Sequence, residues 1–293
     1  MYTIVRYILL AVSHLPLRVL YLLSDFIYFI LRYVMHYRQK VIRKNLQIAF
    51  GDKDEAYRRN IENKFYKHLA DYVVETIKAF SIPMDELGRR YVVRNPEVVD
   101  RYLEAGRSVF MYCAHYGNWE WSIYYPYVLA ECQYLAIYQP QSGKGIDQLM
   151  TEIRTRTGCR AIESQKAYHH IVEYKRDNIT TFTLIIADQS PHRNAKKHWT
   201  TFFNRDTAFL MGPEVMALRT DQVLIFPSVV AYERGRYEIE FKVIDDDVTK
   251  SSGTGLIEKY AALLEEDIRR IPELWLWSHN RWKHKHEDYP DNK

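Results

Sequence analysis

Cysteine is scarce in this chain, and long uncharged runs are missing from it. Its 293 residues include three cysteines and no C-x-x-C pair, which argues against a disulfide framework or a structural zinc site and favours a reducing compartment. The longest uncharged stretch, residues 7–17, is shorter than the roughly 20 residues that a simple membrane-spanning helix needs. The chain also has no internal repeat, low-complexity tract or long linker, which is consistent with one catalytic domain.

A strong excess of charge of either sign is also missing. There are 41 Lys and Arg residues against 37 Asp and Glu residues, and the isoelectric point is near 8.7. With no nucleic-acid-binding motif, this balance argues against a nucleic-acid partner. It suits anionic partners such as phospholipid, a phosphorylated glycolipid or an acidic carrier protein. Aromatic residues, by contrast, make up 14% of the chain, with 24 tyrosines, and their amphipathic rings suit a membrane–water interface.

Residues 4–35 are rich in apolar side chains and carry one regular line of charges. Arg18, Asp25 and Arg32 are seven residues apart, so on a helix they form a narrow stripe that drifts by only about 20° per step. A helix that is apolar everywhere else either lies in the membrane interface or spans the membrane obliquely with its stripe against protein. The basic flank at 36–44 favours the cytoplasmic side and anionic headgroups.

Two alternatives apply to this N-terminal segment. It could be a buried helix of the globular core, or residues 1–15 could be a signal peptide cleaved near Ala11-Val12-Ser13. Because an even more apolar segment follows at once, an anchor is favoured over a cleaved signal. We therefore predict a membrane anchor or interfacial helix at 1–35 and a single catalytic domain at 36–293.

The pattern of apolar runs predicts an α/β fold. Four mainly apolar runs predict buried strands at 108–114, 134–139, 181–187 and 223–231. Segments with a helical pattern lie at 54–80, 118–131, 144–157, 164–177 and 254–271. Gly235 separates two extended runs within 232–243, which is typical of a hairpin. Strands that alternate with helices predict a single mixed, largely parallel sheet flanked by helices, with the membrane-associating helix at the N-terminus.

The most informative motif begins where the strand at 108–114 ends. His115 and Glu120 are five residues apart, which in one continuous helix is about 500° of rotation, so the two side chains would diverge. They can meet if His115 lies on the strand-to-helix turn and Glu120 on the first helical turn. Gly117 relaxes the backbone there, and Asn118 is a preferred N-cap.

Such a pair suits acid–base chemistry. An imidazole at the mouth of a sheet, oriented by a carboxylate beside a helix N-terminus, can take a proton from an acceptor hydroxyl. We therefore predict that His115 is the general base and that Glu120 orients and polarises it. The alternative is an ordinary strand-end histidine and a first-turn glutamate that favours the helix dipole.

Other polar side chains follow the same logic. Asp188 comes directly after the strand at 181–187, where residues beyond the carboxyl ends of parallel strands orient substrates or hold active-site loops; the alternative is a turn-forming aspartate. Arg154 and Arg156 precede Gly158 near the end of a predicted helix and suit bidentate contacts with phosphate or carboxylate. Two positions apart, they cannot share a helix face, so we expect at most one in a site. The alternative is that both are solvated.

Two stretches nearer the C-terminus could contact lipid. Residues 200–203 and 208–213 could line an apolar acyl groove or belong to the core. The tail at 275–283 mixes indole rings with cations, which suits the rim of a lipid headgroup site. Three histidines lie between 279 and 286, but no carboxylate or cysteine spacing supports a metal site, and we predict no metal.

Taken together, these motifs resemble the late acyltransferases of lipid A biosynthesis (the lauroyl/myristoyl transferase family). That family belongs to a wider group of glycerolipid acyltransferases marked by a histidine, four residues and an acid. The resemblance covers nearly the whole chain. It rests on these stretches, in chain order: 45–50, His115 to Glu120, Asp147 with Arg154, Arg156 and Gly158, Ala187-Asp188-Gln189, Phe202-Phe203 with Thr207-Ala208 and Gly212-Pro213, and 272–283. The chain departs from the family's usual pattern at Ser190 and His192, and at Asn280 before Arg281.

The resemblance implies an enzyme at the cytoplasmic face of the bacterial inner membrane, with its acyltransferase domain at 36–293. It would move a fatty acyl chain from acyl carrier protein to a hydroxyl of an anionic glycolipid, a lipid A precursor, with no metal or bound redox cofactor. The predicted substrate-binding residues are Asn118, Arg154, Arg156, Asp188 and Arg281. The alternatives are an acyltransferase for a lysophospholipid or an aminolipid, and a non-catalytic membrane scaffold. A scaffold would not need both members of the His115 and Glu120 pair.

Overall fold

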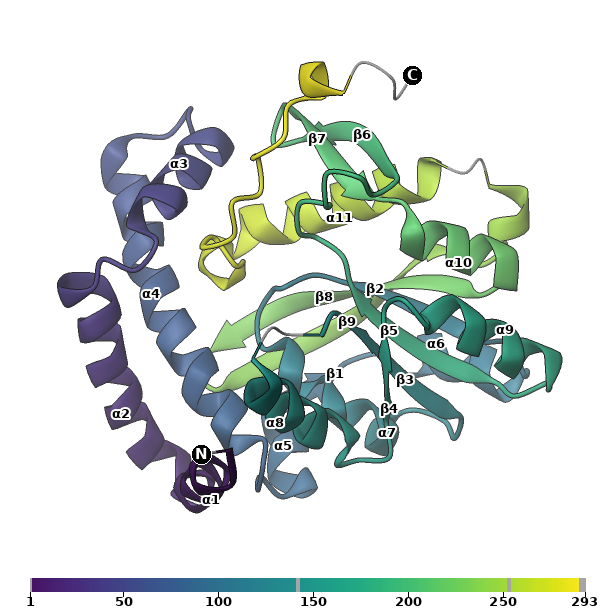
Figure 1. Ribbon diagram of the computed structural model, residues 1–293, viewed down its shortest axis with the longest axis horizontal. Helices are drawn as coiled ribbons and strands as arrows, with labels where there is room; N and C mark the ends of the chain where they lie inside the picture. The colour runs from purple at the N-terminus through teal and green to yellow at the C-terminus, as the bar shows by residue number, and fades with distance from the viewer. Residues whose placement is uncertain (1, 141–142, 252–253, 290–293) are drawn as a thin grey trace.

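A seven-stranded sheet forms the centre of the protein in a computed structural model that describes residues 2–140, 143–251 and 254–289. The strand order is β1-β9-β8-β2-β5-β3-β4 (Figure 1). Every neighbouring pair is parallel except β8 and β9, so the predicted mixed, largely parallel sheet is confirmed. The strands are β1 Tyr91–Val93, β2 Val109–Cys113, β3 Gln133–Tyr138, β4 Arg160–Glu163, β5 Thr181–Ile186, β8 Val223–Glu233 and β9 Arg236–Asp245.

Helices flank this sheet, as predicted. In Figure 1, α11 lies above the sheet, and α5, α7 and α8 lie in the lower half of the view. The α-helices are α1 Tyr2–Ser13, α2 Leu17–Phe29, α3 Gln39–Ala49, α4 Glu55–Lys78, α5 Met84–Arg90, α6 Glu97–Glu104, α7 Tyr125–Val128, α8 Lys144–Thr155, α9 Ala167–Arg176, α10 Gly212–Thr220 and α11 Gly255–Arg270. Short turns of other helix types are η1 Ile30–Val34, η2 Trp119–Tyr124, η3 Val248–Lys250, η4 Pro272–Leu274 and η5 His286–Asp288.

The four predicted strands lie where expected, as β2, β3, β5 and β8, and the predicted hairpin turns at Gly235 between β8 and β9. The helix predicted at 118–131 differs: it is a 3₁₀ helix, η2, that runs into one short turn, α7. Pro126 lies in the first turn of α7 and has no amide hydrogen, so it cannot continue an α-helical hydrogen-bond ladder from the preceding turn.

The stretches considered for an apolar acyl groove belong instead to the core. They form an antiparallel hairpin of β6 Lys197–Phe202 and β7 Arg205–Leu210, followed by α10. Phe202, Phe203 and Phe209 are buried in this hairpin, and their rings contact one another. Packing within the hairpin therefore uses up the apolar surface that a groove would need.

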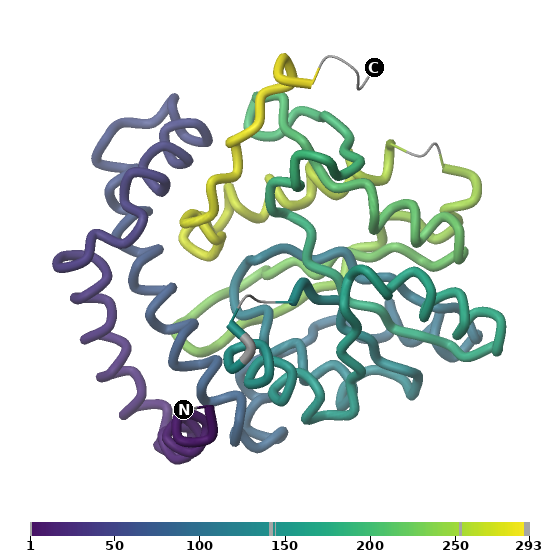
Figure 2. The backbone as a smooth tube through the Cα atoms, viewed as in Figure 1, coloured from purple at the N-terminus to yellow at the C-terminus, as the bar shows by residue number. Residues whose placement is uncertain are grey.

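The N-terminal helices pack against α4 along its length (Figures 1 and 2). Two charges of the predicted stripe face protein: Asp25 pairs with Arg234 at 2.7 Å, and Arg32 with Glu62 at 3.0 Å. On the outer side, large apolar side chains are exposed; Leu22 is 70% exposed and Phe26 61%. Among the described residues, no helix has both the length and the apolar character needed to cross a membrane.

Buried polar contacts attach α1 and α2 to α4. The Ser24 hydroxyl donates to Asp71 at 2.5 Å, and the Tyr21 hydroxyl donates to Glu75 at 2.8 Å. The Lys78 ammonium donates to the carbonyl of Ser13 at 3.0 Å. Since these partners are all on α4, residues 2–35 are packed into the same body as the sheet rather than extending away from it.

Candidate active site

The register of two parallel strands brings His115 and Asp188 together. In the β2–β5 pair Cys113 lies opposite Ile186, so His115 and Asp188 each stand two residues beyond the paired ends. His115 Nδ1 lies 2.7 Å from Asp188 Oδ1. With its proton on Nδ1, the neutral imidazole has Nε2 as its accepting nitrogen, which lies 3.4 Å from the side-chain amide nitrogen of Gln189. The His115 side chain is 22% exposed. A histidine held in this way is oriented to act as a base.

The environment of Asp188 keeps it ionised. Burial by itself would raise the pKa of this carboxyl, but the facing His115 imidazole and hydrogen bonds from His115 and Trp275 outweigh that effect and hold the pKa below its usual value. Trp275 Nε1 donates to Asp188 Oδ2 at 2.8 Å. The carboxylate therefore accepts from the imidazole on one oxygen and from an indole on the other.

Residues 274–276 of the C-terminal tail hold the turn that carries His115 (residues 114–118, the catalytic turn) from one side. Trp275 forms an antiparallel bridge with Tyr116, the Leu276 amide donates to the His115 carbonyl at 3.1 Å, and the Gly117 amide donates to the Leu274 carbonyl at 3.0 Å. The prediction that these indoles form a headgroup rim is wrong, because Trp275 is 2% exposed and its N–H is bound to Asp188. Trp275 is the site residue that sequence reasoning placed in the wrong role.

Glu120 has a different partner from the one predicted. Arg154, near the end of α8, binds it with two hydrogen bonds, Nη2 to Oε1 at 2.6 Å and Nε to Oε2 at 3.0 Å. Trp119 Nε1 donates to the same carboxylate at 3.1 Å. The expected orientation of His115 by Glu120 is thus corrected: Asp188 orients His115, and Glu120 holds Arg154.

Asn118 begins the helix after the turn, as its residue type predicts, because its side chain accepts from the Trp121 amide at 3.2 Å. Its amide group donates to Glu75 at 2.7 Å, and the residue is buried. The structure therefore gives Asn118 a cap and a buried partner, and it does not place this predicted substrate-binding residue in the cleft.

Two predicted substrate-binding arginines also lie away from the cleft. Arg156 donates to the carbonyls of Ala79 and Ile82 at 2.7 and 2.6 Å, because it points from the opposite side of α8 from Arg154. Arg281 is 2% exposed, and its guanidinium carbon lies 4.4 Å from the centre of the Phe209 ring. Burial lowers the pKa of Arg281 to about 10, although Asp188 opposes that shift. Arg281 thus supports the site from behind rather than binding substrate at its surface.

The C-terminal histidines have separate protein partners. His279 accepts from the Ser190 amide at 3.0 Å, and burial lowers its pKa to about 4, so it is a neutral acceptor. His284 Nε2 lies 2.9 Å from the Pro191 carbonyl, and His286 Nδ1 lies 2.6 Å from Asp206. Two of these contacts fix the loop after Asp188, which forms part of the wall of the site.

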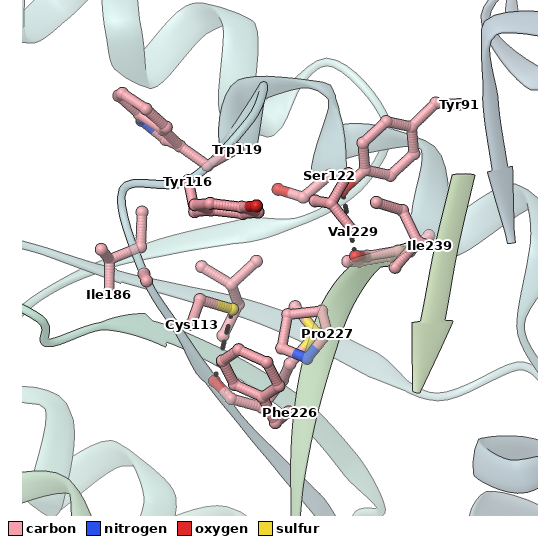
Figure 3. A pocket seen from close by; sticks show the side chains of 14 residues that line it. Tyr91, Cys113, Tyr116, Trp119, Ser122, Ile186, Phe226, Pro227, Val229 and Ile239 are labelled. Carbon is pink, nitrogen blue, oxygen red and sulfur yellow. Dashed lines mark hydrogen bonds between the residues drawn. The ribbon is translucent and has the colours of Figure 1, made fainter. Parts of the chain in front are cut away.

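An open cleft of about 530 Å³ contains His115, Glu120 and Arg154 among its lining residues, and its volume is about 1300 Å³ when the open space at its mouth is included. Directly beside it lies a narrow apolar pocket of about 30 Å³, or about 410 Å³ when the open space around it is included (Figure 3). The two share Trp119, Ser122, Leu184 and Ile186. The rest of the pocket is mainly apolar: Tyr91, Met111, Cys113, Ala114, Tyr116, Tyr125, Phe226, Pro227, Val229 and Ile239. A base, a cation and an apolar chamber therefore adjoin.

This arrangement of side chains can remove a proton from a hydroxyl that lies next to a bound hydrocarbon. The protein matches the model of the bacterial lipid A biosynthesis acyltransferase family over residues 1–284, and it belongs to that family. It is an acyltransferase, and the resemblance noted in the sequence is confirmed.

Two relatives show how far the match extends. One is the lipid A biosynthesis palmitoleoyltransferase of Escherichia coli (strain K12), and the other is the lipid A biosynthesis acyltransferase of Shigella flexneri. Each is 22% identical to this chain over 273 residues, which is 92% of this chain and 86% of the relative.

Proposed function

We propose that this enzyme moves a fatty acyl chain from acyl carrier protein to a hydroxyl of a lipid A precursor at the cytoplasmic face of the bacterial inner membrane. The observation that carries the proposal is that His115, held by Asp188, lines the same cleft as Arg154, and that this cleft adjoins the apolar pocket. His115 is the base, Asp188 orients it, and Glu120 acts through Arg154. No step of the proposed reaction requires a metal or a bound cofactor.

In the proposed reaction His115 Nε2 takes the proton of the acceptor hydroxyl while that oxygen attacks the thioester carbonyl. The imidazolium is stabilised by Asp188, which accepts from Nδ1. The tetrahedral intermediate then collapses, the carbon–sulfur bond breaks, and His115 returns the proton to the departing thiolate. The products are the acylated hydroxyl and the free thiol of the carrier, so no other reactant is needed.

The apolar pocket suits the acyl chain of the donor. Its walls are mainly aliphatic and aromatic carbon, and two of its tyrosine hydroxyls, those of Tyr91 and Tyr125, are buried 3.1 Å apart. The part of a fatty chain that packs against these walls is removed from water, which favours binding. On the cleft side, the exposed loop residues Arg193 and Lys196, which follow the cleft-lining His192, provide cations suited to an acidic carrier protein.

The cation in the cleft suits a phosphorylated acceptor. Glu120 engages two of the three nitrogens of Arg154, and a guanidinium has five N–H donors, so donors remain for a phosphate. Burial lowers the pKa of Arg154, but Glu120 raises it by more, so the guanidinium stays charged. Lipid A precursors carry several anionic groups and match this site better than a neutral aminolipid.

Arg154 should bind the acceptor selectively. We expect Arg154→Lys to raise the KM for a lipid A precursor roughly ten- to a hundred-fold and to leave the KM for acyl carrier protein nearly unchanged, because a bidentate charge-assisted contact is worth about 1.5–3 kcal/mol. The combined variant Arg154→Met with Glu120→Gln should show the same split without leaving a carboxylate buried and unpaired. Steady-state kinetics with each substrate varied in turn measure both constants.

A dephosphorylated acceptor is the matched control. With that acceptor, the difference in KM between wild type and Arg154→Lys should shrink to less than about two-fold. An equal rise in the KM values for acceptor and donor would show that Arg154 does not bind the acceptor selectively. Faster turnover of lysophosphatidic acid than of the lipid A precursor by the wild type would favour the lysophospholipid alternative.

We further propose that the exposed apolar face of α1 and α2 sits in the membrane interface. Leu22 and Phe26 lie on it, and α1 contacts the helix that carries Arg154, since Arg6 binds Glu152 of α8 at 2.7 and 2.5 Å. A membrane surface at α1 would therefore lie beside the helix that contributes Arg154 to the cleft.

Leu22→Glu and Phe26→Glu should each weaken binding to anionic vesicles roughly ten- to a hundred-fold, because each removes a side chain whose burial contributes about 1.5–3 kcal/mol. Co-sedimentation with vesicles measures the change. Ile179→Glu is the control: Ile179 is also exposed (43%) but precedes β5 on another part of the surface. If all three variants bound vesicles like the wild type, the membrane-facing surface would have to lie elsewhere.

A further inference from the structure

One face of α4 supports the whole turn that carries His115. Its side chains recur at helical spacing: His68 Nε2 lies 3.3 Å from the Gly117 carbonyl, the Tyr72 ring stacks on Trp119 at 4.2 Å, and Glu75 accepts from Asn118. The backbone carbonyl of Glu75 also accepts from Trp121 Nε1 at 3.1 Å. The position of α4 thus sets the position of residues 117–121.

The Glu75 carboxylate accepts hydrogen bonds from three side chains on three different elements. Its Oε2 accepts from Asn118 at 2.7 Å and from Tyr237 of β9 at 2.9 Å, while its Oε1 accepts from Tyr21 of α2 at 2.8 Å. The residue is 0% exposed. One buried carboxylate therefore joins the helix with the exposed apolar face to the residue that begins η2, three positions after His115.

We infer that Glu75 is a positioning residue that couples the seating of α2 to the geometry of the catalytic turn. This inference rests on the proposed function only because the proposed acyl transfer is the reaction whose kcat is measured. When α2 is seated, Tyr21 fixes one oxygen of Glu75 and thereby fixes the other oxygen against Asn118. Asn118 then holds the first turn of η2, with Glu120 and its Arg154 partner, in register with His115.

Alternative roles for this carboxylate are excluded by its surroundings. It lines none of the described cavities that contain His115, and three protein donors occupy its oxygens, so it does not touch substrate. Burial raises the pKa of Glu75 to about 7, while the hydrogen bonds from Asn118 and Tyr21 oppose that rise. Above neutral pH it is a carboxylate that needs these donors.

A reciprocal pair of substitutions tests the Glu75–Asn118 contact. Asn118→Asp keeps a side chain that can cap Trp121 but places a second carboxylate 2.7 Å from Glu75. At about pH 8 we expect kcat to fall about ten-fold with the donor KM unchanged. Adding Glu75→Gln should restore kcat to within about two-fold of wild type, because the new amide can donate to the aspartate and still accept from Tyr21. Glu75→Gln alone should be mild, since its oxygen can face Asn118 and its amide can donate to the Tyr21 hydroxyl.

Tyr21→Phe tests the link to α2. It removes one hydroxyl and keeps the ring, and we expect kcat to fall about five- to ten-fold, again with little change in donor KM. Tyr28→Phe is the matched control on the same helix, because the exposed Tyr28 hydroxyl lies 3.2 Å from the Tyr33 hydroxyl, also in the N-terminal segment, and has no hydrogen bond to Glu75. That control should keep wild-type kcat.

A measurement without substrate separates this inference from the proposed reaction. The His115 imidazole resonance can be assigned by NMR from its absence in His115→Ala. It should move in Asn118→Asp and in Tyr21→Phe, return in the Asn118→Asp, Glu75→Gln double variant and stay in place in Tyr28→Phe. If the wild type did not acylate the lipid A precursor but the variants showed these changes in the resonance, only the acceptor assignment would be refuted. An active wild type in which Asn118→Asp and Tyr21→Phe change neither kcat nor the resonance would overturn the role of Glu75.

Discussion

His115→Ala should lower the kcat of acyl transfer roughly 10²–10⁴-fold, which is the range typical for loss of a positioned general base. The fold should survive, because the imidazole is partly exposed in the cleft and Asp188 keeps its hydrogen bond from Trp275. Turnover of a lipid A precursor by purified protein measures kcat, and thermal unfolding checks the fold.

His169→Ala is the control for this experiment. His169 lies on α9 with its side chain 77% exposed, and it should have wild-type kcat. Full activity of purified His115→Ala would rule out proton transfer by this imidazole and, with it, the proposed mechanism.

Asp188→Asn should cause a loss of similar size, roughly 10²–10⁴-fold in kcat, for a reason specific to this site. Trp275 can only donate, so the oxygen of the new amide must face the indole. The amide nitrogen then faces His115 Nδ1 and forces that nitrogen to become the acceptor. The proton moves to Nε2, and the imidazole can no longer accept a proton from substrate there.

The same argument predicts a partial rescue. In Asp188→Asn combined with Trp275→Phe the amide is free to turn its oxygen toward His115, so kcat should rise about ten-fold above that of Asp188→Asn alone. Trp275→Phe by itself should have a much smaller effect than Asp188→Asn. If the double variant were no faster than the single one, Asp188 would not act by selecting the tautomer of His115.

Much of the fold follows from the sequence because the strands of the central sheet are buried. β2, for example, is fully buried along its length and forms the continuous apolar run that a strand covered on both faces needs. The elements that pattern analysis missed are short or polar, such as β4 and the β6–β7 hairpin. β6 and β7 pair locally with each other, but Trp275 and Trp282, which pack on Phe202, come from far along the chain.

The partner of His115 depended on strand order. Both His115 and Asp188 come directly after a predicted strand, and that equal spacing is a signal when the strands are neighbours, as β2 and β5 are. Periodicity identifies strands but not which of them pair. When the pairing of β2 with β5 is unknown, sequence proximity favours Glu120 as the partner of His115.

Local chemistry was more predictable than the placement of distant partners. The residue type of Asn118 predicted its capping role, and the two-residue spacing of Arg154 and Arg156 predicted that only one would reach a site. The environment of Trp275 could not be inferred in the same way, because its position depends on the tail returning alongside the catalytic turn. Trp275 and Asp188 are 87 positions apart in the sequence, and a contact between such distant residues leaves no local sequence pattern.

Mass spectrometry of lipid A most directly tests the claim that this chain acylates a lipid A precursor through His115 and Asp188. Lipid A should be compared between cells that have the gene and cells from which it is deleted. The deleted cells should also be tested after they receive either the wild-type or the Asp188→Asn protein at equal abundance. Loss of the gene should remove the mass of one fatty acyl group, wild-type protein should restore it, and Asp188→Asn should not. An unchanged lipid A mass after loss of the gene would contradict the assignment of lipid A as the acceptor, and restoration by Asp188→Asn would contradict the assigned site.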